Sequence, residues 1–399
     1  MGLRRFLTVF LVAGLLLAVG PVASASHAAL TLTASPSEVR FGDTVALSGT
    51  LTSSSDGSPL PDQTVRVFDA AEQEVGADVT GPDGGFSVTF QPPANVVLHA
   101  EWQDPDQPDH VVTSPEVTVQ VHAVVAVGIA DVRLFGRARA AGRVDPAHPG
   151  EQVKVELLRG DRVVAVKRPV QGSDGGFSVR FGIRRVGAYR ARATFEDADH
   201  LPGQDTSGKR TTPLPALKTG RSSVYVLLLE RRLRELRYRV PQPDRRFDFR
   251  TGDAVLAFNK VQGRKRVGYV NASTWRALVS PRKPQPHSRA HGLHVEVDKT
   301  KQVLYLVRDG VIADIVHVST GRLQGWTREG VFKVYRKLAG YSGKRLYYPS
   351  YFDGLRAVHG WPEVPPFPAS HGCVRVPMWT ARYLFDRIPI GTVVRIYRS

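Results

Sequence analysis

The only cysteine of the chain, Cys373, lies in a segment whose residue types suit nucleophilic catalysis. It belongs to Ser370-His-Gly-Cys-Val-Arg375, and His359-Gly360 precedes it across a Pro-rich loop. Since a thiolate is the reactive form of cysteine and an imidazole can take its proton, Cys373 and His359 are a candidate nucleophile and base. A free thiol has a pKa of about 8.5, so we expect the surroundings to lower it. Gly372 lets backbone approach a substrate, and the Cys373 N–H is a candidate oxyanion donor.

Two other interpretations of these residues stay open at this stage. His359, His371 and Cys373 are a possible zinc set, because two histidines and a cysteine occur in catalytic zinc sites. His371 and Cys373 are two positions apart, which places them on one face of a strand. The thiol is otherwise a small buried apolar side chain.

Composition and charge limit the function classes. The chain has 399 residues, a net charge of +17 and 42% apolar residues, which excludes a mostly disordered or fibrous protein. The length predicts several domains. Residues 1–122 carry a net charge of −10, whereas residues 209–399 carry a net charge of +23. This uneven distribution of charge indicates that the C-terminal half meets an anionic partner.

The N-terminus favours export. Two arginines, an apolar run from Phe6 to Val19, and Ala23-Ser-Ala25 are typical of a secretory signal peptide, predicted as residues 1–25. An uncleaved leader would instead act as a membrane anchor. Export predicts an extracytoplasmic location in the cell wall or an equivalent of the periplasm. It also excludes nucleic acid as the partner and favours an anionic cell wall.

Residues 26–208 contain an internal repeat. Gly81-Pro-Asp-Gly-Gly-Phe-Ser-Val-Thr-Phe90 returns as Gly172-Ser-Asp-Gly-Gly-Phe-Ser-Val-Arg-Phe181. Short alternating strands and Asp-Gly turns predict two β-sandwiches, at residues 26–121 and 122–208. They resemble bacterial Ig-like domains, which usually act as spacers.

After a linker, the sequence period becomes helical. Val226, Leu229, Leu233, Leu236 and Tyr238 form one stripe, and Ala254, Val255 and Phe258 form a second behind Thr251, an N-cap or first-turn residue. Thr274, Trp275 and Leu278 indicate a third helix. Residues 209–280 therefore resemble a three-helix peptidoglycan-binding module, with Glu230, Arg237 and Asn259 departing from its usual Gln, Gly and Gln. We expect the fold, while glycan binding stays open.

The last domain, residues 291–398, reads as mostly β. Strands are predicted at 294–298, 303–307, 311–318 and 393–397, with Asp309-Gly310 as a hairpin turn. Together with His359-Gly360 and Ser370–Arg375, this region resembles the L,D-transpeptidase catalytic domain of the YkuD type. The family usually has Thr-Pro-x-Gly where this chain has Thr327-Arg-Glu-Gly330. The fold class expected for the whole chain is multidomain and mainly β.

The resemblance implies roles for the motif residues. Cys373 would be the nucleophile and His359 the proton acceptor and donor, oriented by the backbone carbonyl of Gly360. Gly372 would add a second oxyanion N–H, and His371 would support the site. The resemblance assigns substrate contacts to Ser370, Arg375, Tyr347, Tyr348 and Trp361, and Tyr351 is a further aromatic candidate.

The implied reaction is acyl transfer on peptidoglycan stem peptides. Attack by Cys373 would release D-Ala and leave a thioester, and a neighbouring amine would then form a 3→3 crosslink. Neither a metal nor an organic cofactor is expected. An L,D-carboxypeptidase, which uses water as the acceptor, is one alternative. A wall-binding structural protein with an inactive catalytic domain is another.

Overall fold

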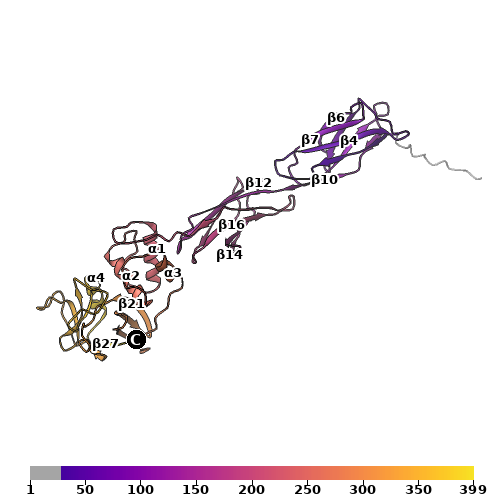
Figure 1. Cartoon of the computed structure of the whole chain (residues 1–399). Coiled ribbons are helices and arrows are strands. Elements are labelled where there is room, and N and C mark those ends of the chain that lie inside the picture. Colours follow the sequence, from indigo (N-terminus) through magenta and orange to yellow (C-terminus); the bar gives the residue numbers. More distant parts are fainter. Residues whose placement is uncertain (1–27) are drawn as a thin grey trace, which may run out of the picture. The chain divides into compact units, whose positions relative to one another are not determined.

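The computed structural model describes residues 28–399, and the predicted leader at residues 1–25 lies outside them. The described residues divide into two units, the first up to Val124 with Phe195–Gly203, and the second Val125–Thr194 with Gln204–Ser399. The described residues are mainly β, as the sequence predicts (Figure 1). None of the described helices is long and apolar enough to span a bilayer.

The first unit consists of two sheets around one apolar core that includes Leu47, Val65 and Leu98. One sheet has the order β1 (Ala28–Leu30), β4 (Val45–Ser53), β2 (Thr33–Ser35), with β7 (Gly85–Phe90) also on β4. The other has the order β3 (Glu38–Arg40), β10 (Val117–His122), β8 (Val96–Gln103), β5 (Thr64–Asp69), β6 (Glu74–Val79), with β9 (Val111–Thr113) on β8.

Two further sheets open the second unit. One has the order β11 (Val124–Ala130), β12 (Arg137–Asp145), β15 (Gly176–Gly182). The other has the order β14 (Arg162–Lys167), β13 (Lys154–Arg159), β16 (Ala188–Phe195), β17 (Gly203–Thr206), with β18 (Arg210–Thr211) on β16. Alternating burial along β12 places small side chains inside and arginines outside, the pattern of a half-buried strand.

The two copies of the repeat share one close contact. A Cβ on Gly49 would lie 1.9 Å from the Thr31 carbonyl oxygen and 2.6 Å from the Phe86 ring. A Cβ on Gly142 would lie 2.0 Å from the carbonyl oxygen of Ala126 and 2.6 Å from the ring of Phe177. The glycine therefore makes room for the same phenylalanine in both copies. The assignment of these sheets to the Ig-like class stays a prediction.

Three helices follow, α1 (Val224–Glu235), α2 (Phe249–Val261) and α3 (Ala272–Val279). Ser223, Asp248 and Asn271 cap their N-termini through side-chain oxygens. Thr251 is a first-turn residue, because Asp248 is the N-cap of α2. Its hydroxyl donates to Glu230, which is buried and also accepts the Asp244 N–H at 2.7 Å.

The end of α1 differs from the predicted stripe. The helix stops at Glu235, and Arg237 has a φ of +70°. The N–H of Arg237 bonds the carbonyl of Arg234, and the N–H of Tyr238 bonds that of Leu233, which closes the last turn. Tyr238 therefore lies outside the helix and bridges to Ile315, although it stays buried in the core that α1 shares.

The C-terminal domain has two sheets and one helix, drawn in orange to yellow in Figure 1. The first sheet has the order β21 (Val311–His317), β20 (Val303–Arg308), β19 (Leu293–Asp298), β27 (Val393–Tyr397), β22 (Gly330–Lys333). The second has the order β23 (Arg336–Lys337), β24 (Tyr347–Asp353), β25 (Arg356–Trp361), β26 (Val374–Pro377), and α4 (Met378–Arg387) packs on it. The four strands predicted here are present.

The five-stranded sheet is covered on both faces. Leu304 and Leu306 of β20 join the core shared with the second sheet and α4. Val303, Tyr305 and Val307 on the same strand join the core formed by α1, α2 and α3. Burial on both faces explains why β20 is an uninterrupted apolar run instead of an alternating one.

We predict that Arg237→Gly stabilises the chain by about 0.5–1 kcal/mol, because glycine adopts a positive φ without the steric cost that arginine incurs there. Urea unfolding at neutral pH measures this change. Arg234→Gly, inside α1, is the matched control and should destabilise by about 1 kcal/mol. A loss of stability in Arg237→Gly would contradict the prediction.

Candidate active site

Strands β25 and β26 bring the two halves of the motif together. They pair in parallel, with His359 opposite Arg375 and Gly360 opposite Val376. Cys373 comes immediately before β26, so its position is set where that strand begins. The Pro-rich loop between them therefore connects two neighbouring parallel strands of one sheet.

His359 has the properties of a neutral base. It is 2% exposed, and its Nδ1 lies 2.9 Å from the carbonyl oxygen of Gly360. That carbonyl can only accept, so Nδ1 carries the proton and Nε2 keeps a free lone pair. Burial lowers the pKa of His359 to about 4, and this effect outweighs the bond to Gly360. At neutral pH the imidazole is therefore ready to accept a proton.

Gly360 is required by the packing of α4. A Cβ at this position would lie 2.7 Å from the Cβ of Ala381, 3.1 Å from the Tyr347 ring and 3.2 Å from the sulfur of Met378. The 2.7 Å contact with Ala381 is closer than Cβ atoms come to other atoms in proteins, so the close approach of β25 to α4 requires glycine here. The same residue supplies the carbonyl that orients His359.

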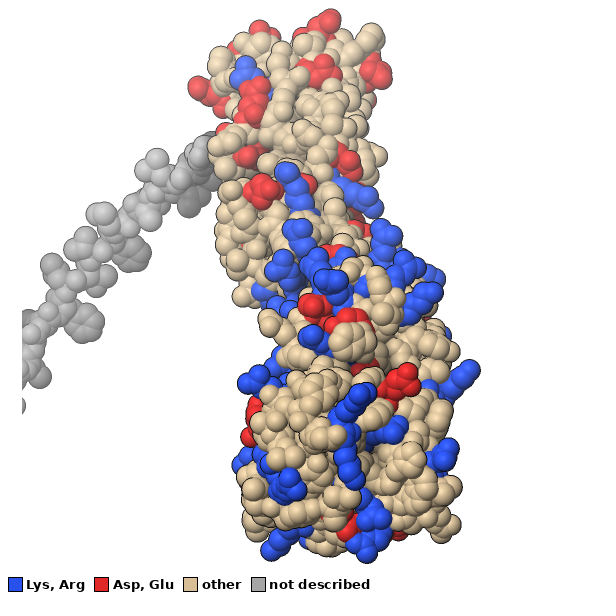
Figure 2. Space-filling model, turned by 90° about the vertical axis from the view of Figure 1, so that its left-hand side faces the viewer, with Lys and Arg blue, Asp and Glu red and all other residues tan. Residues whose placement is uncertain are grey.

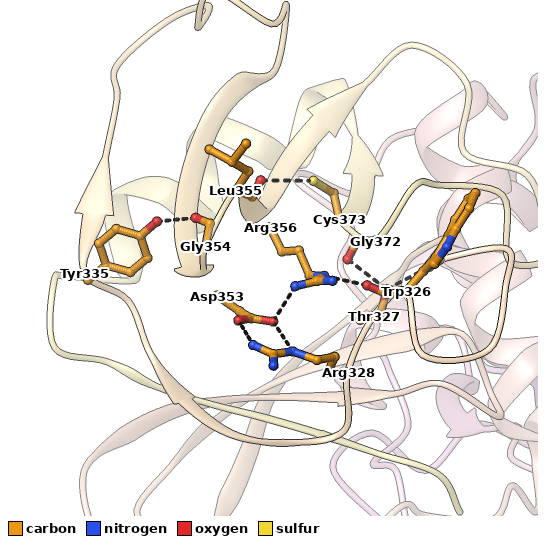
Figure 3. Close-up of polar contacts among 11 residues, drawn as sticks. Trp326, Thr327, Arg328, Tyr335, Asp353, Gly354, Leu355, Arg356, Gly372 and Cys373 are labelled. Atoms are coloured by element: carbon orange, nitrogen blue, oxygen red, sulfur yellow. Dashed lines mark hydrogen bonds and ion pairs between the residues drawn. The ribbon is translucent and has the colours of Figure 1, made fainter.

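Cys373 is a neutral thiol in the resting site. It is partly exposed, and its Sγ lies 3.8 Å from the carbonyl oxygen of Leu355 (Figure 3). Burial raises its pKa, while Arg375 and Arg356 act in the opposite direction with smaller effect. The expected lowering of this pKa is therefore not found in the resting site, because desolvation disfavours the thiolate more than the arginines favour it.

Ser370 and Gly372 fix the loop that carries the cysteine. The Ser370 hydroxyl donates to the Cys373 carbonyl at 2.6 Å and accepts the Gly372 N–H at 3.0 Å. The Gly372 N–H could act as an oxyanion donor only by giving up its hydrogen bond to Ser370. Among the described residues, the Cys373 N–H has no hydrogen-bond acceptor. Gly372 has a φ of +126°, and a Cβ there would lie 2.5 Å from the Trp326 carbonyl oxygen.

Thr327 joins this loop to the neighbouring segment. It is fully buried, and its hydroxyl donates to the Gly372 carbonyl and accepts the Gly321 N–H, both at 2.8 Å. Thr327 begins the Thr327-Arg-Glu-Gly330 sequence that departs from the usual family pattern. Its role in holding Gly372 was not evident from the sequence.

An ion-pair network holds the β24–β25 turn next to the cysteine (Figure 3). Arg328 binds both carboxylate oxygens of Asp353, and Arg356 Nη1 binds the same carboxylate at 2.9 Å. Arg356 Nε also donates to the Trp326 carbonyl at 2.5 Å. The bond from Arg328 is the main reason why the pKa of Asp353 is lowered. Arg328, the residue in place of the usual proline, thus braces the turn that presents Leu355 to Cys373.

The predicted substrate residues lie in different surroundings. The Arg375 guanidinium lies 4.8 Å from the ring centroid of Trp361, and Trp361 meets His359 edge-on at 5.7 Å. Both are partly exposed beside the base. Tyr347 packs beside Gly360, whereas Tyr348 packs on Phe385 of α4 at 5.1 Å, on the core side.

Tyr351 and His371 complete the set. Tyr351 is buried in a small cluster with Leu346 and Ala357. His371 is exposed and stacks on the ring of Trp326 at 5.0 Å. The guanidinium of Arg322 also lies over the Trp326 ring, 5.8 Å from its centroid. Trp326 and Arg322 were not identified from the sequence, since no motif marks them.

The zinc set considered from the sequence is not assembled in residues 28–399. The described clusters whose ligand atoms converge within 4.8 Å do not include His359, His371 and Cys373. His371 faces Trp326, and His359 uses Nδ1 on its own backbone neighbour. These three side chains therefore point to different partners.

A buried lysine of α2 ties the helices to the active-site loop. Lys260 is 3% exposed, and its Nζ lies 3.0 Å from the carbonyl oxygens of Gln302 and Val318 and 2.6 Å from His317 Nδ1. The Nε2 of His317 in turn donates to the Val364 carbonyl at 2.8 Å. Val364 belongs to the Pro-rich loop between the two halves of the motif.

Two further bonds hold the same Pro-rich loop. Arg266, just beyond α2, donates to the Pro366 carbonyl at 2.9 Å. The hydroxyl of Ser319 donates to the Phe367 carbonyl at 2.7 Å. The helices therefore act as part of the scaffold of the active site, a role that their sequence pattern did not reveal.

Comparison with known proteins identifies the C-terminal domain. Residues 292–396 match the family described as the L,D-transpeptidase catalytic domain, YkuD. An L,D-transpeptidase structure from Xylanimonas cellulosilytica is 35% identical over 46% of this chain and 99% of that chain, with a TM-score of 0.44. One from Stackebrandtia nassauensis is 26% identical over 47% and 97%, with a TM-score of 0.30.

A third solved structure is similar over the C-terminal part. The catalytic domain of an L,D-transpeptidase from Enterococcus faecium is 24% identical over 28% of this chain and 100% of that chain, with a TM-score of 0.24. A search of curated proteins found no match.

Lys260 gives the stability of the chain a specific pH dependence. Burial lowers its pKa to about 6, far below its ordinary value. Between pH 6.5 and 8.5 the unfolded chain therefore binds one more proton here than the folded chain, and stability rises with pH by up to about 1.4 kcal/mol per unit. Urea unfolding across this range measures the slope.

The slope should fall by up to about 1.4 kcal/mol per unit in Lys260→Met and stay unchanged in Lys265→Met, which removes an exposed lysine nearby. An unchanged slope in Lys260→Met would contradict this account.

The raised pKa of Cys373 predicts slow alkylation at neutral pH. Iodoacetamide should react with the folded protein more slowly than with the urea-unfolded chain at pH 7, and the rate should still rise above pH 9, because only the thiolate reacts. His359→Gln should keep this pH profile. If the alkylation rate instead reaches its plateau below pH 7, Cys373 is a thiolate paired with a charged imidazole, and the prediction is wrong.

Proposed function

Because the chain belongs to the L,D-transpeptidase family through its C-terminal domain, we propose that it is a cysteine transpeptidase that forms 3→3 crosslinks between peptidoglycan stem peptides. The observation that carries the proposal is the pairing of β25 with β26. It places a neutral, oriented His359 on the strand next to the one that follows Cys373.

In the acylation step, His359 Nε2 takes the proton of the Cys373 thiol as the sulfur attacks the carbonyl carbon of an L,D peptide bond. The Gly360 carbonyl, bonded to Nδ1–H, stabilises the imidazolium that forms. The Cys373 N–H faces the developing oxyanion. His359 then returns the proton to the leaving nitrogen, D-Ala departs with its amine neutral, and a thioester remains.

In the second step, an amine of another stem attacks the thioester carbonyl. His359 takes a proton from the attacking nitrogen and gives it to the departing sulfur, which restores the neutral thiol. An amide bond forms as the thioester breaks, so the acyl group is transferred without an external energy source. Because Cys373 starts protonated, base assistance by His359 is needed in the first step.

Arg375 is the proposed contact for a stem carboxylate. It lies above Trp361, beside His359, and its charge acts on both His359 and Cys373. A guanidinium can hold a carboxylate through two parallel hydrogen bonds. Trp361, stacked under this arginine, would form the apolar wall of the same subsite.

The location is also a proposal. The leader pattern at residues 1–25, outside the described residues, and the +23 balance of residues 209–399 support an exported protein that meets an anionic wall. The action of L,D-transpeptidases on peptidoglycan agrees with this location.

We predict that a carbapenem acylates the purified chain on Cys373 with 1:1 stoichiometry, because the proposed nucleophile comes directly before the strand that pairs with the strand of His359, a neutral base. Intact-mass spectrometry detects the adduct, and peptide mapping locates it. Cys373→Ser should form no adduct, and His359→Gln should form it at least about 100-fold more slowly. A folded protein that forms no adduct and does not turn over stem peptides would refute the proposal.

Product analysis then decides between the two acceptors. Stem tetrapeptide incubated with an acceptor amine should yield the crosslinked dimer. Tripeptide alone, formed at the same rate with and without amine, would instead identify a carboxypeptidase. Activity that persists in Cys373→Ala would exclude both cysteine mechanisms.

A further inference from the structure

Basic side chains gather on the outer face of β12 and β15. Figure 2 shows Lys and Arg crowded over this second pair of sheets, whereas Asp and Glu outnumber them on the first pair. A groove on this face contains five basic residues and no carboxylate; it is lined by Arg137, Arg139, Lys167, Ser178, Val179, Arg180, Gly182 and Arg184. We call Arg137, Arg139 and Arg180 the arginine face.

The arginine face brings like charges close together. Arg139 lies directly opposite Arg180 in the antiparallel pair, and Arg137 follows on the same side of β12, about 7 Å along the strand. Like charges directly opposite one another destabilise a sheet. All three side chains are exposed, so water screens but does not remove this repulsion.

No carboxylate neutralises the arginine face in the part of the chain that the structure describes. Arg139 Nε donates to the hydroxyl of Ser178 at 2.9 Å, which orients it without cancelling its charge. At the end of the groove, Arg184 does have a partner, Glu235 at 3.4 Å. The three central arginines therefore leave their charge available to a ligand.

The internal repeat shows that the fold does not need these arginines. Gly49 opposite Phe86 in the first copy corresponds to Gly142 opposite Phe177 in the second. In this alignment, the positions of Arg137, Arg139 and Arg180 are occupied in the first copy by Thr44, Ala46 and Thr89. Ala46 lies opposite Thr89 there, as Arg139 lies opposite Arg180 here.

We infer that the arginine face binds a linear polyanion with repeated phosphodiester groups, of the polyol-phosphate class. Guanidinium groups hold phosphate through paired hydrogen bonds, and a row of them at strand spacing suits a chain with one charge per repeat unit. The groove contains no aromatic side chain, so it offers no stacking platform for the bases of a nucleic acid. This inference is independent of the chemistry at Cys373.

Fluorescence anisotropy of labelled poly(glycerol phosphate) with the full chain tests the inference. The triple variant Arg137→Thr, Arg139→Ala and Arg180→Thr adopts the residues of the first copy, so it should fold. The matched control is Arg221→Thr, Arg276→Ala and Arg308→Thr, which removes the same charge from three exposed arginines elsewhere. Circular dichroism and carbapenem acylation check the fold of both variants.

We expect the arginine-face variant to lose at least about 10-fold in affinity at low salt, and the control to lose less than about 3-fold. The slope of log K against log salt should become shallower by about 2 in the arginine-face variant, since three ion pairs are lost at about 0.7 each. Equal losses in the two variants would overturn the inference. So would tighter binding of polyglutamate or a single-stranded oligonucleotide than of poly(glycerol phosphate).

Discussion

Close backbone contact at two glycines is the constraint on which the active site depends. Gly360 lets β25 pack on α4, and Gly372 lets the cysteine loop lie against the Trp326 carbonyl. Both positions lack room for a single methyl group. Because each glycine is adjacent to one of the two candidate catalytic residues, the packing of the sheet and the placement of His359 and Cys373 are set by the same contacts.

Polar contacts between segments that are distant in the sequence are a second constraint on the site. The buried amine of Lys260 and the ion pair formed by Arg328 and Asp353 hold the two loops around the cysteine. The Asp353 side chain is 7% exposed and accepts from both Arg328 and Arg356, which offsets much of the cost of removing its charge from water. Charges around His359 and Cys373 do not stabilise an ion pair there, so both groups rest neutral and the proton moves only when a substrate is attacked.

The sequence was sufficient for features that depend on local pattern. Short motifs made Cys373 and His359 the candidate nucleophile and base, which stays a prediction, and apolar periodicity predicted the strands of the C-terminal domain and the three helices, which are present. It did not predict the contacts between distant segments, such as Lys260 with His317 or Arg328 with Asp353. A lysine in a helix and an arginine in a loop read as solvent-facing until the fold is known, because only three-dimensional proximity reveals their partners.

The sheet that is buried on both faces has a consequence for how the molecule can be divided. Residues 292–396 match a known catalytic domain, yet one side of β20 belongs to the core of the preceding helices. A fragment that begins at residue 291 would expose Val303, Tyr305 and Val307 to water. Such a fragment should therefore be less stable and more prone to aggregation than a chain that keeps α1, α2 and α3.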